Sequence, residues 1–179
     1  MAFSEIKAAA VITFFLRQAN GTLNDLKLMK LMYFAEREAI RVRNVGIVED
    51  VYFALPRGPV LSATLNLIRD EPAEAGEAES VLRQHVQIDK DWQVTIKDCV
   101  EPEAQLSKRE LAILQATWDA NKDKTKWELV YESHELPEYM DPNGSSHEIT
   151  FAAILKGLGY EGDALESRLK EWRSYREAV

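Results

Sequence analysis

Histidine and cysteine are the side chains that most often carry nucleophilic catalysis or bind metal, and this chain has three histidines and one cysteine. Cys99 follows Asp98 directly, with no adjacent base that would favour its thiolate. The Gly-x-Ser-x-Gly elbow of serine hydrolases does not occur in the sequence. We therefore interpret Cys99 as a buried or incidental thiol rather than a nucleophile.

A metal site would have to form in the loop that begins near residue 134. Two His-Glu pairs with two further acids between them supply nitrogen and oxygen donors there: His134-Glu135, Glu138, Asp141 and His147-Glu148. Their spacing matches neither His-Glu-x-x-His nor the paired cysteines of zinc sites. The simpler interpretation is that His134 anchors the loop, because a ring at the end of a short helix can bond its free carbonyl groups.

The run Arg57-Gly58-Pro59 interrupts an apolar stretch and could form a ligand loop or begin a helix. A phosphate loop needs several glycines and a Lys-Ser or Lys-Thr pair, whereas this run has one glycine and Pro59 removes an N–H donor. Residues 51–56 are predicted to be extended, since a residue before proline avoids helical dihedrals. A helix is predicted from Pro59, in its first position, to about Asp70.

A long helix predicted over 22–43 carries a basic stripe. At about 100° per residue, its core face is formed by Leu28, Leu31, Met32, Ala35, Ala39 and Val42. Four cations share an arc of about 80° away from that face: Lys27, Lys30, Arg37 and Arg41. Phe34 lies inside this arc, and aromatic rings are typical of contact surfaces. The stripe is either a solvated helix face, which is the commoner case, or a surface that meets the phosphates or carboxylates of a partner.

Capping signals predict the other helices. The first runs over 4–19 after Ser4, and the long helix then opens at a capping box of Thr22 and Asp25. Ser107 and Thr125, each followed three residues later by Glu, begin helices over 107–120 and 125–134. Two more helices are predicted over 147–159 and 163–178, the last of them rich in charge.

A β-hairpin is predicted over 86–96, where apolar residues alternate on both sides of a three-residue polar connection. The preceding residues 70–79 hold five acids and no base, together with Pro72 and Gly76, so we expect an acidic loop or a frayed helix there. The fold class is therefore mainly α (α+β). We expect residues 1–179 to form a single compact helical domain of about six to seven helices, with the loop and small β-hairpin inserted at about 70–98.

Charge is unevenly distributed along the 179 residues, whose formal net charge is −8. Residues 1–43 hold seven Lys or Arg against four Asp or Glu, and the remainder holds fifteen against twenty-six. The acidic excess of residues 44–179 disfavours broad nucleic-acid binding and suits a cationic protein partner. A need for solubility explains the same excess equally well. One cysteine fits a reducing compartment, and the charged N-terminal segment fits neither a membrane span nor a signal peptide. We expect a cytoplasmic protein without a cofactor.

Two motifs together resemble the SocA-like Panacea antitoxin domain. The first is Lys-Leu-x-Lys-Leu-x-Tyr-Phe-Ala over 27–35, and the second is Asp50 followed by an extended run and Gly58-Pro59-Val60. The segment Ser133-His134-Glu135-Leu136-Pro137 is similar to a third element of the family. The resemblance extends over about residues 4–160.

The resemblance implies a binding protein without enzymatic activity, which neutralises a cognate toxin and in some members delivers it to an AAA+ protease. In this interpretation one set of residues is structural: Leu28, Leu31, Tyr33, Gly58 and Pro59. A second set is expected to contact the partner: Lys27, Lys30, Phe34, Arg37, Arg41, Arg57 and His134. Two alternatives stay open, namely a nucleic-acid-associated regulator that uses the basic stripe and a small metal-dependent hydrolase that uses His134 and His147.

Overall fold

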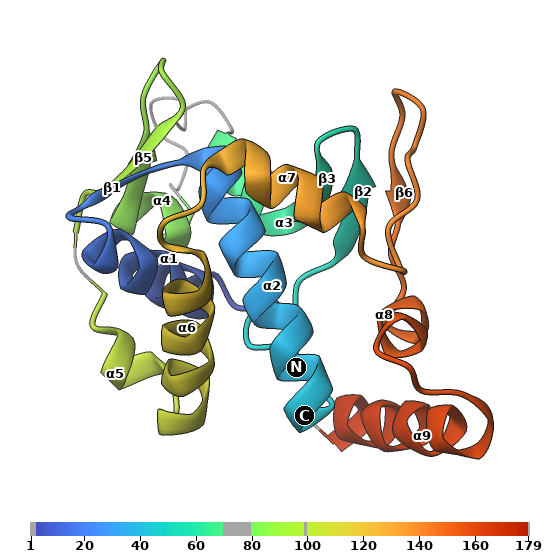
Figure 1. Cartoon of the computed structure of the whole chain (residues 1–179). Coiled ribbons are helices and arrows are strands. Elements are labelled where there is room, and N and C mark those ends of the chain that lie inside the picture. Colours follow the sequence, from blue (N-terminus) through green and yellow to red (C-terminus); the bar gives the residue numbers. More distant parts are fainter. Residues whose placement is uncertain (1–2, 70–79, 99, 179) are drawn as a thin grey trace.

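The computed structural model describes residues 3–69, 80–98 and 100–178, and these residues form nine helices and six short strands (Figure 1). The helices are α1 (Glu5–Gln18), α2 (Asp25–Arg43), α3 (Ser62–Arg69), α4 (Val81–His85), α5 (Pro102–Gln105), α6 (Lys108–Asn121), α7 (Lys126–His134), α8 (Phe151–Gly157) and α9 (Gly162–Ala178). The strands are β1 (Thr22–Asn24), β2 (Tyr52–Leu55), β3 (Gly58–Leu61), β4 (Val86–Ile88), β5 (Gln93–Ile96) and β6 (His147–Glu148). The protein is therefore mainly helical with small antiparallel sheets, which agrees with the predicted mainly α (α+β) class.

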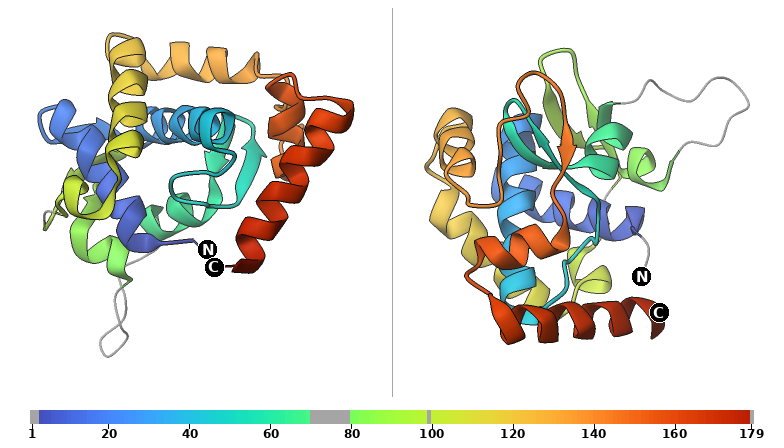
Figure 2. Two further views of the ribbon diagram at one scale, coloured as in Figure 1. Left: turned by 90° about the horizontal axis from the view of Figure 1, so that it is seen from below. Right: turned by 90° about the vertical axis from the view of Figure 1, so that its right-hand side faces the viewer.

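Helix α2 forms the centre of the packing. It contacts α1, α6, α7 and β3, and Figure 2 shows it enclosed by these elements, with α9 along the outer edge. The residues predicted for its core face fulfil that role, since Leu28, Leu31 and Ala39 have no exposed surface. Burial of this apolar face supplies the main force that holds the helices together.

Two three-stranded antiparallel sheets flank α2. In one, the predicted hairpin β4–β5 is joined by β1, which pairs Leu23 with Val94. In the other, the hairpin β2–β3 is joined by the two-residue strand β6. The sequence predicted the β4–β5 hairpin and an extended run over 51–56, which contains β2. It missed β3, whose residues were assigned to a helix, and it missed β1 and β6, which are only three and two residues long.

Several predicted helix starts are confirmed. Ser4 accepts a hydrogen bond from the backbone N–H of Lys7 and caps α1. Ser107 and Thr125 cap α6 and α7, each in a complete capping box. Helix α9 also occupies its predicted place. Short polar caps satisfy backbone donors locally, so they can be read from neighbouring residues alone.

The predicted start of α2 is wrong by three residues. Thr22 does not open the helix but begins β1, and the side chain of Asn24 caps α2 by accepting from the N–H of Leu26 at 3.2 Å. Pairing of residues 22–24 with β5 competes with the capping box and wins. The sequence signal was local, whereas the competing interaction comes from residues about 70 positions away.

The predicted helix start at Pro59 is also wrong. Residues 58–61 form β3, in which Pro59 lies opposite Ala54, and α3 begins only at Ser62. Pro59 is tolerated because β3 is an edge strand of its sheet, where a missing N–H need not break a ladder. Pro56-Arg57 is thus the turn of a hairpin, and Gly58 after it has a φ of +93°.

The last predicted helix boundary to change is at 147, where His147 and Glu148 form β6 and α8 begins at Phe151 behind the cap Thr150. The short helices α4 and α5 were not predicted, which raises the count from the expected six or seven to nine in the described residues. The acidic loop at 70–79 and Cys99 lie outside the described residues. No described helix combines the length and apolarity that a membrane span needs.

Candidate functional site

The three sequence motifs meet at one buried junction between α2, the β2–β3 hairpin and α7. The Lys30 ammonium from α2 donates to the carbonyl of Pro59 at 2.7 Å, and Lys30 has no exposed surface. Burial lowers the pKa of Lys30 to about 7. This side chain therefore fastens the hairpin to the central helix.

Gly58 lets the three elements approach one another closely. Its φ of +93° is unfavourable for any residue with a Cβ. A Cβ at Gly58 would also lie 2.4 Å from Ser133 Oγ of α7 and 2.9 Å from Lys30 Nζ of α2. The glycine of the motif is thus required by its backbone conformation and by the space around it.

A carboxylate closes the other side of the junction. Glu138, which follows α7, accepts from Arg37 Nε at 2.6 Å and from Tyr33 OH at 3.2 Å. Arg37 also donates to the carbonyl of Gly157 at 3.0 Å and so joins α2 to α8. Burial, assisted by the charge of Glu138, raises the pKa of Tyr33 well above its ordinary value. Tyr33 and Arg37 thus hold the segment after α7 in place.

Two further acids organise the loop between α2 and α3. Glu36 is buried, and its carboxylate accepts from the N–H groups of Ile47 and Val48 at 2.9 and 2.7 Å. Asp50, the acidic residue of the motif, accepts from the N–H of Thr64 at 2.8 Å and from its hydroxyl at 2.7 Å. Asp50 therefore caps α3, although the β2–β3 hairpin separates the two in the sequence. Both acids have structural roles.

The basic stripe of α2 is not the solvated face that its pattern favoured. Lys30 is enclosed, and Arg37 is bound to Glu138. Lys27 Nζ donates to the carbonyl groups of Lys122 and Lys124 at 2.8 and 2.6 Å, at the end of α6. Arg41 remains exposed and pairs with Glu38 on its own helix. Neighbouring elements thus engage Lys27, Lys30 and Arg37 and leave Arg41 exposed, which a single-helix projection cannot show.

Phe34 and His134 were also predicted to contact a partner, and both are half-buried. Phe34 packs against the core. The His134 ring stacks on Tyr139 with centroids 4.5 Å apart and an interplanar angle of 4°. Among the described residues, its buried Nε2 atom has no hydrogen-bond partner, so this nitrogen does not make the expected bond to a free carbonyl. Contact of either residue with a partner stays a prediction.

The donors around 134–148 do not come together. Among the described residues, no three His, Cys, Asp or Glu side chains lie close enough to share a metal ion. Glu138 points to Arg37, and His147 lies in β6 opposite Ala54. The loop therefore does not form the cluster that the metal alternative requires.

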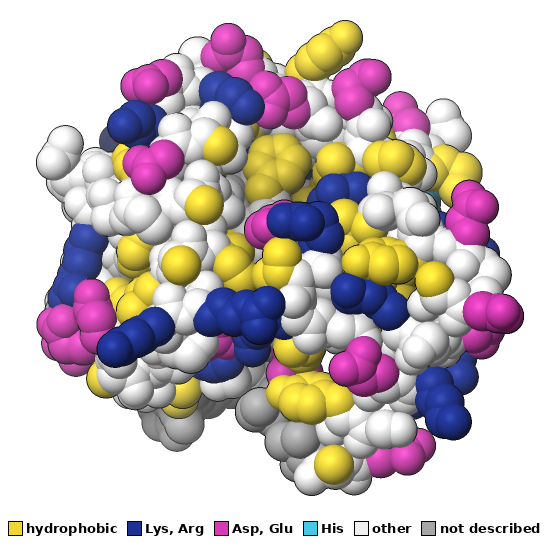
Figure 3. All heavy atoms as spheres, turned by 60° about the horizontal axis from the view of Figure 1, so that its bottom comes forward, with side chains coloured by type: hydrophobic (Ala, Val, Ile, Leu, Met, Phe, Trp, Pro, Cys, Tyr) yellow, Lys and Arg dark blue, Asp and Glu magenta, His cyan; other side chains and the backbone are white. Residues whose placement is uncertain are grey.

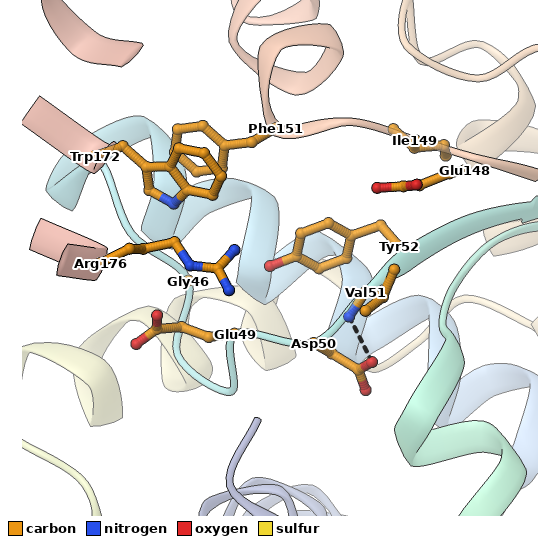
Figure 4. Close-up of a pocket in the computed structure, with 10 residues that line it drawn as sticks. All are labelled: Gly46, Glu49, Asp50, Val51, Tyr52, Glu148, Ile149, Phe151, Trp172 and Arg176. Atoms are coloured by element: carbon orange, nitrogen blue, oxygen red, sulfur yellow. Dashed lines mark hydrogen bonds between the residues drawn. The ribbon is translucent and has the colours of Figure 1, made fainter. Parts of the chain in front are cut away.

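A small pocket of about 110 Å³ lies where α9 meets the body of the protein (Figure 4). Figure 4 shows Arg176 reaching toward Tyr52, between Glu49 and the stacked rings of Phe151 and Trp172. The two rings lie 4.4 Å apart, and Glu49 accepts from Tyr175 OH at 3.2 Å. Ligand pockets are usually of several hundred Å³. These contacts hold α9 in position, so we interpret the pocket as a packing gap between elements rather than a ligand site.

A larger groove lies at the N-terminal end of α2. It consists of two adjoining hollows of about 210 and 260 Å³, which share Leu26, Arg57 and Arg69 in their walls. Its walls come from segments far apart in the sequence, including the β2–β3 turn, the end of α3, the β4–β5 connection and the start of α7. Figure 1 shows how α7 crosses α2 and runs beside β3. We call this feature the α2 groove.

Two exposed tryptophans border the α2 groove, each beside a cation. Trp127 of α7 is 56% exposed, with the Arg57 guanidinium 5.9 Å and the Lys126 ammonium 5.6 Å from its ring centroid. Trp92 is 53% exposed and has the Arg69 guanidinium at 5.1 Å. Large exposed rings beside arginine are typical of protein interfaces. The α2 groove is the candidate functional site.

Of the residues predicted to contact a partner, Arg57 is in the α2 groove, whereas Lys30 is out of reach inside the protein. Sequence reasoning missed Trp92, Trp127, Lys126 and Arg69. A signal was present for Trp127, because a helical projection of α7 places it with Tyr131 opposite the buried Leu129. No local signal brings Trp92 or Arg69 to this place.

The fold and the junction define a mainly helical α+β protein whose motif residues hold a central helix, a β-hairpin and a second helix together. Residues 28–138 match the family model of the antitoxin SocA-like Panacea domain, and the chain belongs to this family. The match contains Lys30, Gly58, Pro59 and Glu138 and ends before α8; it is narrower than the 4–160 suggested by the sequence. No curated protein and no solved structure matches the chain.

Proposed function

We propose that this protein is an antitoxin that neutralises a cognate toxin by stoichiometric protein–protein binding, without catalytic activity and in the cytoplasm. The observation that carries the proposal is membership of the antitoxin SocA-like Panacea family. The junction supports it, because the signature residues Lys30 and Gly58 hold the scaffold together. A shared scaffold leaves the outer surface available for recognition.

Two routes to neutralisation are compatible with this proposal. The antitoxin either blocks the functional surface of the toxin or presents the toxin to an AAA+ protease. The acidic residues of 44–179 give the blocking route a physical basis, because they would oppose a cationic toxin surface that binds nucleotides or RNA. Binding of that kind weakens steeply as salt is added.

Neither alternative function gains support from the described residues. The nucleic-acid-associated regulator depended on the basic stripe, whose Lys30 and Arg37 are engaged inside the protein. The metal-dependent hydrolase depended on His134 and His147, which share no donor cluster in the part of the chain that the structure describes.

Co-expression with the product of the neighbouring reading frame tests the proposal. We expect the neighbouring protein alone to stop growth, this chain to restore it, and the two to co-purify at a fixed stoichiometry. Rescue that survives deletion of the host AAA+ proteases indicates blocking, and rescue that is lost indicates delivery. Failure of the folded chain both to rescue growth and to form a complex would disprove the antitoxin function.

A further inference from the structure

We propose that the α2 groove is the toxin-binding site and that it accepts an acidic segment of the toxin that carries one large apolar side chain. This inference rests on the proposed function and adds to it a location and a partner chemistry. It is drawn from the charge of the groove, the apolar hollow beside it and the tryptophans at its border.

Charge is the first argument. Three cations from separate elements, Arg57, Arg69 and Lys126, line the α2 groove. Of the described lining residues, Asp25 alone is acidic; it is 3% exposed and already bound to Arg69. The groove is therefore cationic on a protein of net charge −8. By contrast, the face seen in Figure 3 mixes both signs of charge among hydrophobic side chains.

The apolar hollow is the second argument. Side chains from α2, β3 and α3 form its floor, namely Leu26, Met29, Val60 and Leu65. Its volume of about 210 Å³ exceeds the roughly 150 Å³ of a protein cavity that holds benzene. Leu26 and Val60 keep little exposed surface, whereas Leu55 and Pro56 in the same wall are partly or fully exposed and offer apolar area for a bound side chain to cover. A large aliphatic or aromatic anchor suits this space.

The tryptophans supply the third argument. Trp92 and Trp127 stand on opposite elements and are both more than half exposed. The Trp127 ring lies beside the Arg57 guanidinium, which can approach a carboxylate, whereas Arg69 beside Trp92 is already paired with Asp25. A bound acidic segment would therefore meet an aromatic ring and a cation together at Trp127 and Arg57. Tryptophan and arginine dominate the energetics of protein interfaces.

The same features favour a polypeptide over a nucleic acid. Single-stranded nucleic acid needs free aromatic faces for its bases and a continuous positive track for its phosphates. Cations already flank both indole rings, and Asp25 neutralises Arg69. The net charge of −8 adds long-range repulsion toward a polyanion.

Variants of the α2 groove test the inference in binding assays with the purified product of the neighbouring reading frame. Arg57→Glu and Trp127→Ala should each weaken binding at least tenfold in calorimetry, since the first reverses a charge in the groove and the second removes an aromatic ring from its border. Lys170→Glu, an equal charge reversal at an exposed site on α9, is the matched control and should change affinity less than twofold. Circular dichroism should show unchanged folding in all three.

The outcomes separate this inference from the proposed function. If wild type and both groove variants bind the toxin equally, the groove assignment is wrong and the antitoxin function stands. If wild type does not bind, the proposed function itself fails. A labelled single-stranded oligonucleotide is the second probe: binding that Arg57→Glu abolishes would show that the groove accepts nucleic acid and would overturn the acidic-peptide assignment.

Discussion

Lys30 shows how a side chain that looks like a surface cation serves as an internal tie. The whole side chain is buried, and its ammonium donates to the Pro59 carbonyl. Desolvation is the cause that lowers its pKa. The cost of enclosing the charge is accepted because the bond fixes the hairpin whose turn carries Arg57.

The enclosed lysine makes stability depend on pH. The pKa is about 7 in the folded protein, below the ordinary 10.5, so the unfolded chain binds more protons between these values and stability rises with pH across this window. The Lys30→Met variant lacks this titrating group. The free energy of unfolding of the wild type, relative to that of Lys30→Met, should therefore rise by about 1.4 kcal/mol per pH unit over the steep part of that window. Urea unfolding at pH 7, 8 and 9 measures this, and parallel curves would refute it.

Gly58 is expected to tolerate a side chain poorly, because both its backbone conformation and its surroundings oppose one. Gly58→Ala combines a strained positive φ with overlap at Ser133 Oγ and should destabilise by about 3 kcal/mol or more. Gly144→Ala is the control, because its φ is also positive, at +84°, yet nothing lies within 4 Å; it should cost about 1 kcal/mol. Equal losses in thermal unfolding would show that overlap is unimportant.

At the scale of elements, accuracy followed the range of the interaction. Capping boxes such as Ser107 with Glu110 involve neighbours in the chain and were predicted correctly. The strand at 58–61 and the cap of α3 by Asp50 depend on partners that only the folded chain brings near. The basic stripe shows the same limit, because the sequence alone does not reveal that residues at the ends of α6 and α8 accept hydrogen bonds from Lys27 and Arg37.

The start of α2 provides a direct comparison of two candidate caps. Asn24→Ala removes the acceptor for the N–H of Leu26 and should destabilise by about 1 kcal/mol. Thr22→Ala changes an exposed strand residue and should cost less than about 0.5 kcal/mol. Chemical denaturation of both variants measures the two losses in the free energy of unfolding. A larger loss for Thr22→Ala would favour the capping box predicted from the sequence.

At the scale of the whole molecule, Glu110 joins three helices. Its carboxylate receives Lys7 of α1 at 2.8 Å and Arg43 of α2 at 2.9 Å while it caps its own helix α6 through Ser107. Burial tends to raise its pKa, but the hydrogen bonds from Lys7 and Ser107 outweigh burial and lower the pKa to about 2. A single charge thus ties the first, second and sixth helices into one unit.

This arrangement predicts the acid limit of the protein. Because the pKa of Glu110 is lower in the folded state, its contribution is complete above about pH 5 and is lost as the pH falls toward 2. Glu110→Gln should destabilise by about 2 to 3 kcal/mol at pH 7. The difference in free energy of unfolding between Glu110→Gln and the wild type should shrink in urea unfolding at pH 4 and pH 3. A difference that stays constant with pH would contradict the ion-pair explanation.

In the β2–β3 hairpin, residues that hold the interior together lie directly beside a residue that faces outward. Gly58 and Pro59 engage the interior, whereas Arg57 at the tip faces outward. Under the proposed function, exchange of the tip residue would alter recognition at little expense in folding energy, because the bond between Lys30 and Pro59 beneath it stays unchanged. Proteins that share this scaffold would then differ in the toxin they bind through substitutions in a few short outer segments, while their interiors stay identical.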